Sequence, residues 1–238
     1  MRTSSPAPEP AQATAQATAP EQERTAGPRS ALLIDFGGVL TSPITDAFAA
    51  VSRAAGLEPD RALSLLKHHE GARSALAEHE VGRLDDEGFE DAFAAALVDV
   101  GGVIEPRGLL ARLEERMVLD EPMVDLVRQV RRSGVPVALV SNSLGRNCYA
   151  RIDLDELFDV SVISGQVGIR KPSRRIYAIA CERLGVDPQE CVLVDDLEHN
   201  LVGAARLGIH GIHHRTAAET IARVRADLGL AAVPAAIP

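Results

Sequence analysis

Asp35 stands at the end of a short apolar run, residues 31–34, and Gly37 and Gly38 follow it closely. This pattern predicts a buried strand that delivers a carboxylate to a loop at the edge of a sheet. Open α/β sheets place their chemistry at the carboxyl ends of their strands. A carboxylate in such a position could attack a phosphorus centre and form an acyl phosphate.

Three later segments carry the other groups that this reaction needs. Ser141 and Asn142 follow a second apolar run, Lys171 precedes a predicted helix, and Asp195 and Asp196 follow a third run. The hydroxyl of Ser141 and nearby backbone amides could bind phosphate oxygens, and Lys171 could supply a positive charge. These segments therefore predict a phosphate-binding site beside the first carboxylate.

The acidic residues also predict a magnesium site. Asp35, Asp195 and Asp196 offer the hard oxygen ligands that Mg²⁺ prefers. A cation there would screen the repulsion between a nucleophilic carboxylate and an anionic phosphate. Each motif alone has a commoner structural explanation, such as a helix cap or a solvated lysine. Their joint occurrence at predicted strand ends favours the functional interpretation.

The elements that must position these residues alternate between strand and helix. Strands are predicted at 31–34, 135–140, 160–163, 191–194 and 211–214, and helices at 123–132, 173–184 and 197–207. Such alternation predicts an α/β fold with a doubly wound, parallel, Rossmann-like sheet. The polar residues follow three of the strands, so the sheet would bring them together.

A different pattern occupies the region between the first two strands. Four apolar stripes at helical spacing lie within residues 47–55, 62–66, 89–97 and 109–113. We expect a helical cap at 45–118, inserted into an α/β core formed by 30–44 and 119–230. Residues 1–29 are rich in Ala, Pro, Gln and Thr, which predicts a disordered segment, and 231–238 are expected to form a flexible tail.

Composition limits the class of partner. A net charge of -9 and an aromatic content of 3% argue against nucleic acid. No apolar stretch approaches the ~18 residues that a membrane span needs, so no membrane partner is expected. The three cysteines show no paired metal spacing and are interpreted as reduced, buried thiols. We expect a cytoplasmic monomer or homodimer that acts on a small molecule.

Over residues 31–215 the sequence resembles the haloacid dehalogenase-like hydrolases. The resemblance rests on four motifs in the family's order, which are Asp35 to Leu40, Ser141, Lys171 and Asp195-Asp196. It extends to flanking residues, including Tyr177, Asn200 and Gly203 to Ala205. The helical insertion is similar to the cap that closes over small substrates in this family.

The resemblance implies a role for each motif. Asp35 would be the nucleophile, and Ser141, Asn142 and Lys171 would bind the phosphate, with Lys171 also stabilising the nucleophile. Asp35 and Asp196 would be direct Mg²⁺ ligands, together with the backbone carbonyl of Gly37. Asp195 would ligate through water or help to orient the site. The implied activity is Mg²⁺-dependent hydrolysis of a small phosphorylated metabolite through an aspartyl-phosphate intermediate.

Gly37 departs from the family pattern. Phosphatases of this family usually carry a second aspartate there, as acid for the leaving group and base for water. Losing such a group costs typically ~10²–10⁴ in rate, which a good leaving group can tolerate. Three interpretations stay open. In the first, the substrate is activated, for example a sugar 1-phosphate, an acyl phosphate or an anhydride. In the second, Thr41, His68 or His69 takes the place of the missing aspartate as acid and base. In the third, the site is slow or inactive.

Three rival functions share parts of this pattern. A 2-haloacid dehalogenase needs no proton for its leaving halide, but such enzymes generally lack the acidic pair and dispense with Mg²⁺. A receiver-type signalling domain carries similar residues in the reverse order and has no helical insertion. A non-catalytic binding protein is the third, and Gly37 is its main support. Residues of the predicted cap that could meet the rest of a substrate are Lys67, His68, His69, Arg73 and Arg83.

Overall fold

The computed structural model of this chain describes residues 29–231. Nearly all of the segment predicted to be disordered, and the predicted tail after Ala231, lie outside the described residues. Among the described residues, no helix has the length and apolar character needed to cross a membrane.

Within residues 29–231, five parallel strands form one sheet in the order β3-β2-β1-β4-β5. The strands are β1 (Ala31–Ile34), β2 (Val137–Ser141), β3 (Val160–Ile163), β4 (Cys191–Asp195) and β5 (His210–His213). Leu33 of β1 pairs with Ala138 of β2 on one side and with Leu193 of β4 on the other. The predicted parallel α/β fold is therefore confirmed, with strand limits shifted by one or two residues.

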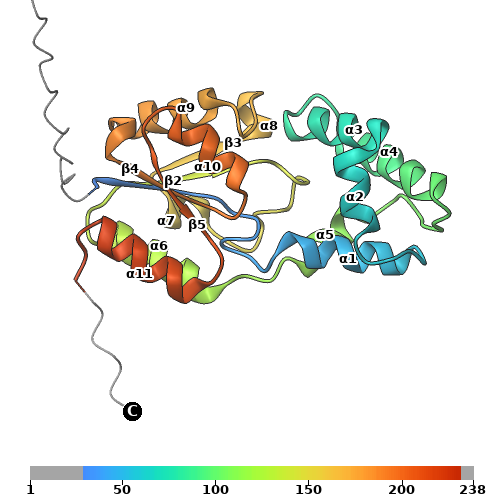
Figure 1. Ribbon diagram of the computed structural model, residues 1–238, viewed down its shortest axis with the longest axis horizontal. Helices are drawn as coiled ribbons and strands as arrows, with labels where there is room; N and C mark the ends of the chain where they lie inside the picture. The colour runs from blue at the N-terminus through green and yellow to red at the C-terminus, as the bar shows by residue number, and fades with distance from the viewer. Residues whose placement is uncertain (1–28, 232–238) are drawn as a thin grey trace, which may run out of the picture.

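Helices cover both faces of the sheet (Figure 1). The helices α6 (Glu121–Arg132) and α11 (Ala217–Asp227) lie on one face, and α9 (Arg174–Leu184) and α10 (Glu198–Ala205) lie on the other. Leu32 and Ile34 of β1 point into the first apolar core, whereas Ala31 and Leu33 point into the second. Because both faces are buried, β1 is a continuous apolar run rather than an alternating one.

Three short elements complete the part of the structure that contains the sheet. They are α7 (Leu154–Leu157), α8 (Ser164–Val167) and the 3₁₀ turn η1 (Pro188–Glu190). Their brevity explains why periodicity did not predict them. Helix α11 was also not predicted, because its sequence buries only Thr220 and Val224.

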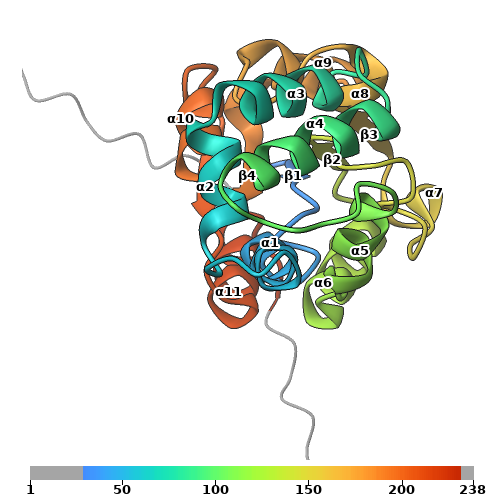
Figure 2. The ribbon, with the colours of Figure 1, turned by 90° about the vertical axis from the view of Figure 1, so that its right-hand side faces the viewer.

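Helices α1 to α5 lie beyond the carboxyl ends of the strands, and Figure 2 shows α2, α3 and α4 in front of the sheet. They are α1 (Ile44–Ala54), α2 (Arg61–His68), α3 (Glu70–Glu80), α4 (Asp86–Asp99) and α5 (Leu109–Arg116). Four of them match the predicted stripes. Helix α3 was missed because it buries two alanines and His79, which make no large apolar stripe. We call α1 to α5 the helical bundle; the exact domain boundaries stay a prediction.

The chain enters and leaves the helical bundle through two adjacent segments. Thr41 and Leu119 form an isolated antiparallel bridge. The amide of Ser42 donates to the carbonyl of Val118 at 2.7 Å, and the amide of Asp120 donates to that of Leu40 at 2.9 Å. The two connections therefore run side by side at the edge of the sheet.

Candidate active site

The predicted chemistry-bearing residues gather at the carboxyl ends of three neighbouring strands. Asp35 follows β1, Ser141 ends β2 and Asp195 ends β4. Strand β1 lies between β2 and β4, at the point where the chain order of the sheet reverses. Ligands of open α/β sheets bind at such a switch point.

Lys171 joins two of these carboxylates. Its Nζ lies 2.7 Å from Asp35 Oδ1 and 2.8 Å from Asp195 Oδ2, and all three side chains are buried. Burial alone would lower the pKa of Lys171, but the charges of Asp35 and Asp195 prevail and raise it. Lys171 is therefore a protonated cation that holds Asp35 in place.

Three carboxylates converge beside Lys171. One oxygen from each of Asp35, Asp195 and Asp196 lies within 4.8 Å of the others. Burial, reinforced by Asp195, raises the pKa of Asp35 to about 7 and that of Asp196 to about 6. When all three are ionised, three negative charges face one ammonium, which leaves two charges unbalanced. A divalent cation that prefers oxygen ligands fits this donor set.

Asp195 is oriented by groups around it. The amide of Leu197 donates to its Oδ1 at 2.9 Å, and Asn200 Nδ2 lies 2.9 and 3.1 Å from its two oxygens. The hydroxyl of Tyr177 in turn donates to the backbone carbonyl of Asn200 at 3.0 Å. The flanking residues Tyr177 and Asn200 thus help to position Asp195.

The loop after Asp35 requires glycine at position 38. Gly38 has a φ of 76°, and a Cβ there would lie 2.5 Å from Asp196 Oδ2. Only a residue without a side chain lets Asp196 approach the loop this closely. Thr41 Oγ1 accepts a hydrogen bond from the Gly38 amide at 3.1 Å. Thr41 therefore holds this loop, and its proposed role as a substitute acid stays a prediction.

Gly37 lies in the same loop but has room for a side chain. A Cβ there would meet only Ile44 Cδ1 at 3.7 Å and Met117 Cε at 3.8 Å, both ordinary contacts. Its φ lies outside the left-handed region. Neither sterics nor backbone conformation demands a glycine here.

Ser141 has a partner that the sequence did not reveal. The hydroxyl of Tyr149 donates to Ser141 Oγ at 2.9 Å. The Tyr149 ring packs on Phe36, with ring centroids 4.9 Å apart. Tyr149 lies in a loop without any apolar period, so no sequence signal pointed to it.

Asn142 connects the sheet to the helical bundle. Its Oδ1 accepts from the Lys171 amide at 2.8 Å, and its Nδ2 donates to Glu80 Oε1 at 3.3 Å. Glu80, the last residue of α3, also forms an ion pair with Arg170 at 2.6 Å. Burial raises the pKa of Glu80, although Arg170 opposes this shift. Asn142 thus positions Lys171, and its predicted contact with substrate stays a prediction.

A cavity of about 340 Å³ opens above these residues. Asp35, Gly37, Ser141, Lys171 and Asp196 all line it. The residues of the helical bundle that line it belong to α1, α2 and α3. They are Ile44, Phe48, Leu63, Leu66, Lys67, Leu76 and Glu80. Of the residues predicted for catalysis, phosphate binding and metal binding, all except Asp195 therefore line one cavity.

Other predicted cap residues lie elsewhere. His68, His69, Arg73 and Arg83 do not line this cavity. His69 Nδ1 accepts from the amide of Ala72 at 3.3 Å and so caps α3. None of the four is therefore part of the wall around a substrate held beside Asp35.

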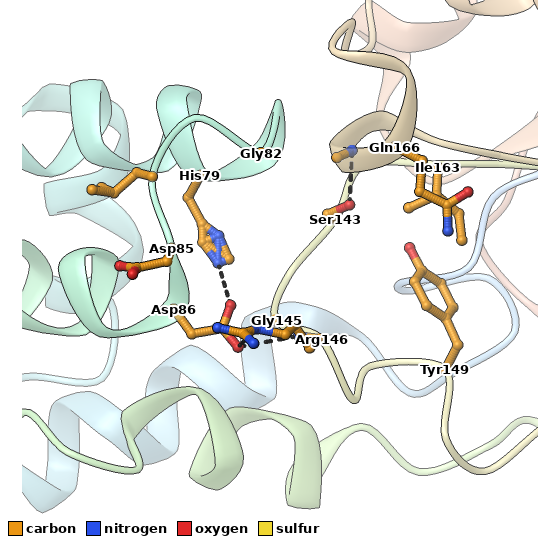
Figure 3. Close-up of a pocket in the computed structure, with 12 residues that line it drawn as sticks. His79, Gly82, Asp85, Asp86, Ser143, Gly145, Arg146, Tyr149, Ile163 and Gln166 are labelled. Atoms are coloured by element: carbon orange, nitrogen blue, oxygen red, sulfur yellow. Dashed lines mark hydrogen bonds and ion pairs between the residues drawn. The ribbon is translucent and has the colours of Figure 1, made fainter.

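A second cavity, of about 390 Å³, lies between the α3–α4 turn and the loop after β2 (Figure 3). His79 and Arg146 both face Asp86 there, each with a nitrogen 3.4 Å from a carboxylate oxygen. Asp35 and Lys171 are not part of its wall. The chemistry is therefore assigned to the first cavity.

Comparisons with known proteins agree with this geometry. A protein-family model described as a haloacid dehalogenase-like hydrolase matches residues 30–208. A phosphoserine phosphatase from Thermus thermophilus is 34% identical over 125 residues, which cover 50% of this chain and 50% of that protein. A validoxylamine A 7'-phosphate phosphatase from Streptomyces hygroscopicus is 26% identical over 210 residues, covering 82% of this chain and 90% of that protein.

A solved structure shares the fold. It is a haloacid dehalogenase family enzyme from Bacteroides thetaiotaomicron in complex with magnesium and inorganic phosphate. The TM-score is 0.58 at 21% identity, and the match covers 79% of this chain and 94% of that chain. Several curated relatives match over half or less of their own length, so their activities are not carried over as a whole.

Proposed function

Because this chain belongs to the haloacid dehalogenase-like hydrolases, we propose that it is a Mg²⁺-dependent phosphatase that forms an aspartyl phosphate on Asp35. The observation that carries the proposal is the buried triad in which Lys171 Nζ lies within 2.8 Å of both Asp35 and Asp195. Asp35 and Lys171, together with Asp196, line a cavity of suitable size for a small substrate.

The two oxygens of Asp35 differ in their surroundings. Oδ1 accepts from the Phe36 amide at 2.7 Å and from Lys171 Nζ. Among the described residues, no hydrogen bond to Oδ2 is formed. We therefore assign Oδ2 as the nucleophile, because its lone pairs are free and its carboxylate is fixed by the other oxygen.

The phosphoryl group would bind beside Ser141 and Lys171, which offer a hydroxyl and a positive charge in the cavity that Asp35 also lines. Asp35, Asp196, Asp195 and the Gly37 carbonyl would hold Mg²⁺. When bound, that ion supplies charge that screens the repulsion between carboxylate and phosphate. The bond from Oδ2 to phosphorus forms as the bond to the leaving oxygen breaks, and water then releases inorganic phosphate from Asp35.

The leaving group must depart without help from position 37. Gly37 has no side chain that could donate a proton, so the departing oxygen takes the electron pair as an anion. We propose that the substrate therefore has a good leaving group. The anomeric oxygen of a sugar 1-phosphate is one such group, and acyl phosphates and anhydrides are others.

Phosphate release from 4-nitrophenyl phosphate tests the proposal with Asp35→Asn and Asp46→Asn. Asp46 is an exposed aspartate in the first turn of α1 and serves as the matched control. We expect Asp35→Asn to lose turnover to background, because an amide oxygen is not a nucleophile of this kind, while Asp46→Asn retains wild-type turnover. Equal rates for the two variants would overturn the role of Asp35.

Dehalogenation is the second candidate, and the absence of a side-chain acid at Gly37 is the observation that favours it. A departing halide needs no proton. The carboxylate cluster with Asp196 favours phosphoryl transfer instead, because a halogenated acid brings no phosphate charge for a cation to screen. Chloride release from 2-chloropropionate in the presence of EDTA, at rates above metal-dependent phosphate release, would replace our proposal with this one.

A further inference from the structure

The helical bundle gives the cavity above Asp35 a mainly apolar wall. Five of its seven lining residues from α1, α2 and α3 are apolar, namely Ile44, Phe48, Leu63, Leu66 and Leu76. Phe48 and Leu66 are anchored in the main apolar core, and the other three pack against that core while remaining partly exposed. These helices lie over the strand ends (Figure 2), so this wall meets the part of a substrate that projects away from the sheet.

Glu80 of the wall and Asn142 of the loop after β2 are engaged in hydrogen bonds with protein groups. Glu80 accepts from Arg170 at 2.6 Å and from Asn142 at 3.3 Å. The side-chain oxygen of Asn142 accepts a hydrogen bond from the Lys171 amide. The remaining polar side chain of the wall is Lys67, which is exposed near the end of α2. The wall therefore offers few hydrogen-bond partners to a leaving group with several hydroxyls. The cavity's other polar side chains, Ser143, His199 and Asn200, lie outside the helical bundle.

We propose that the leaving group of the natural substrate is apolar, and specifically that it is an aryl or acyl group whose oxygen departs as a stable anion. This inference rests on the proposed function and narrows it. The apolar wall favours a leaving group with an apolar body. Because Gly37 supplies no acid, the oxygen of that group must be stable as an anion. The cavity volume of about 340 Å³ restricts that group to a single ring or a short chain.

The step balances without a proton donor. Asp35 Oδ2 forms a bond to phosphorus, the bond between phosphorus and the aryl or acyl oxygen breaks, and its electron pair leaves on that oxygen. A phenolate or carboxylate takes up a proton from water after it has left the cavity. We expect sugar phosphates to have a lower kcat/KM than such substrates, because the apolar wall forms no hydrogen bonds with sugar hydroxyls.

The test is a series of 4-alkylphenyl phosphates with hydrogen, methyl, ethyl and propyl substituents, assayed with Mg²⁺ for phosphate release. The alkyl group changes the apolar area while the acidity of the phenol stays almost constant. We expect kcat/KM to rise about fourfold per methylene until the cavity is full, as apolar burial predicts. Glucose 1-phosphate should be turned over with a kcat/KM about 10²-fold below the best aryl phosphate.

Leu63→Ser and Leu57→Ser form a matched pair for the wall. Both leucines are half-buried and pack against the same core, but only Leu63 lines the cavity. Leu63→Ser should flatten the dependence on alkyl length, and Leu57→Ser should keep the wild-type slope. If Leu63→Ser does not fold, Leu63→Phe provides the test, because a larger side chain should penalise the propyl ester and spare the phenyl ester.

The outcomes separate this inference from the proposed function. A flat alkyl series, a slope unchanged in the Leu63 variants, or glucose 1-phosphate as the better substrate would overturn the apolar leaving group while leaving the phosphatase intact. Phosphate release from none of these esters, by a folded wild-type protein with Mg²⁺, would overturn the phosphatase and this inference together.

Discussion

Replacing Gly37 with aspartate should convert this site into one that also cleaves poor leaving groups. The backbone at position 37 accepts a side chain, and a Cβ there meets Ile44 and Met117 at 3.7 and 3.8 Å. Both neighbours are apolar, so the new carboxyl group would be partly desolvated and its pKa raised. A raised pKa suits a group that must donate a proton near neutral pH.

The size of the effect follows from the two steps of the reaction. A positioned general acid is worth ~10²–10⁴ in rate, which is about 3–5 kcal/mol of barrier. That gain should appear in kcat/KM for an alkyl phosphate such as glycerol phosphate, whose leaving alkoxide needs the proton. For 4-nitrophenyl phosphate kcat/KM should barely change, while kcat rises if hydrolysis of the aspartyl phosphate limits turnover.

Gly37→Ala is the control, because it adds the Cβ without the carboxyl group. It should keep wild-type kinetics and stabilise the fold by about 0.4–1 kcal/mol through the unfolded chain. The assay compares kcat and kcat/KM of both variants on the two esters, with urea denaturation as a check on folding. If Gly37→Asp gained no more than Gly37→Ala on glycerol phosphate, the view that this position lacks only an acid would be refuted.

Three further changes test the surroundings of the site. Lys171→Met leaves two buried carboxylates without their counter-charge and should cost about 3–5 kcal/mol in urea denaturation as well as activity; unchanged stability would contradict the charge argument. Tyr149→Phe removes the hydrogen bond to Ser141 but keeps the ring packing, so inhibition by inorganic phosphate should weaken about 2- to 10-fold, whereas an unchanged inhibition constant would exclude a role in phosphate binding. Burial lowers the pKa of His79 from 6.5, so the unfolded chain takes up a proton at a higher pH than the native state does. The free energy of unfolding should therefore fall as pH drops through about 6.5. His79→Gln should reduce this dependence of unfolding free energy on pH, and an equal dependence in the variant would argue against the burial effect.

The sequence was sufficient for the sheet and for the residues at its edge. The apolar runs of β2 and β4 end in a polar residue and that of β1 is followed by one, and parallel strands bring such ends together. This is why the sequence alone predicts that Asp35, Ser141 and the acidic pair lie at one edge of the sheet.

The contributions from the helical bundle could not be predicted in the same way. Helix α3 buries alanines and a histidine, so it shows no apolar stripe, and Glu80 at its end was missed with it. Tyr149 reaches Ser141 from a loop, where position depends on tertiary packing rather than on period. The apolar wall combines residues from three helices, and only their packing in space reveals that Leu63 and Leu76 face Asp35's cavity.

Because Thr41 and Leu119 are adjacent, the helical bundle begins and ends at one place beside the sheet. Seen from the sheet, all of α1 to α5 is one long loop whose two ends already touch. The entropy of closing a loop grows only as the logarithm of its length, with about 0.6 kcal/mol for each doubling. Helices can therefore be lengthened, exchanged or resurfaced there at little cost to the sheet, so that selectivity can evolve while the reaction centre stays the same.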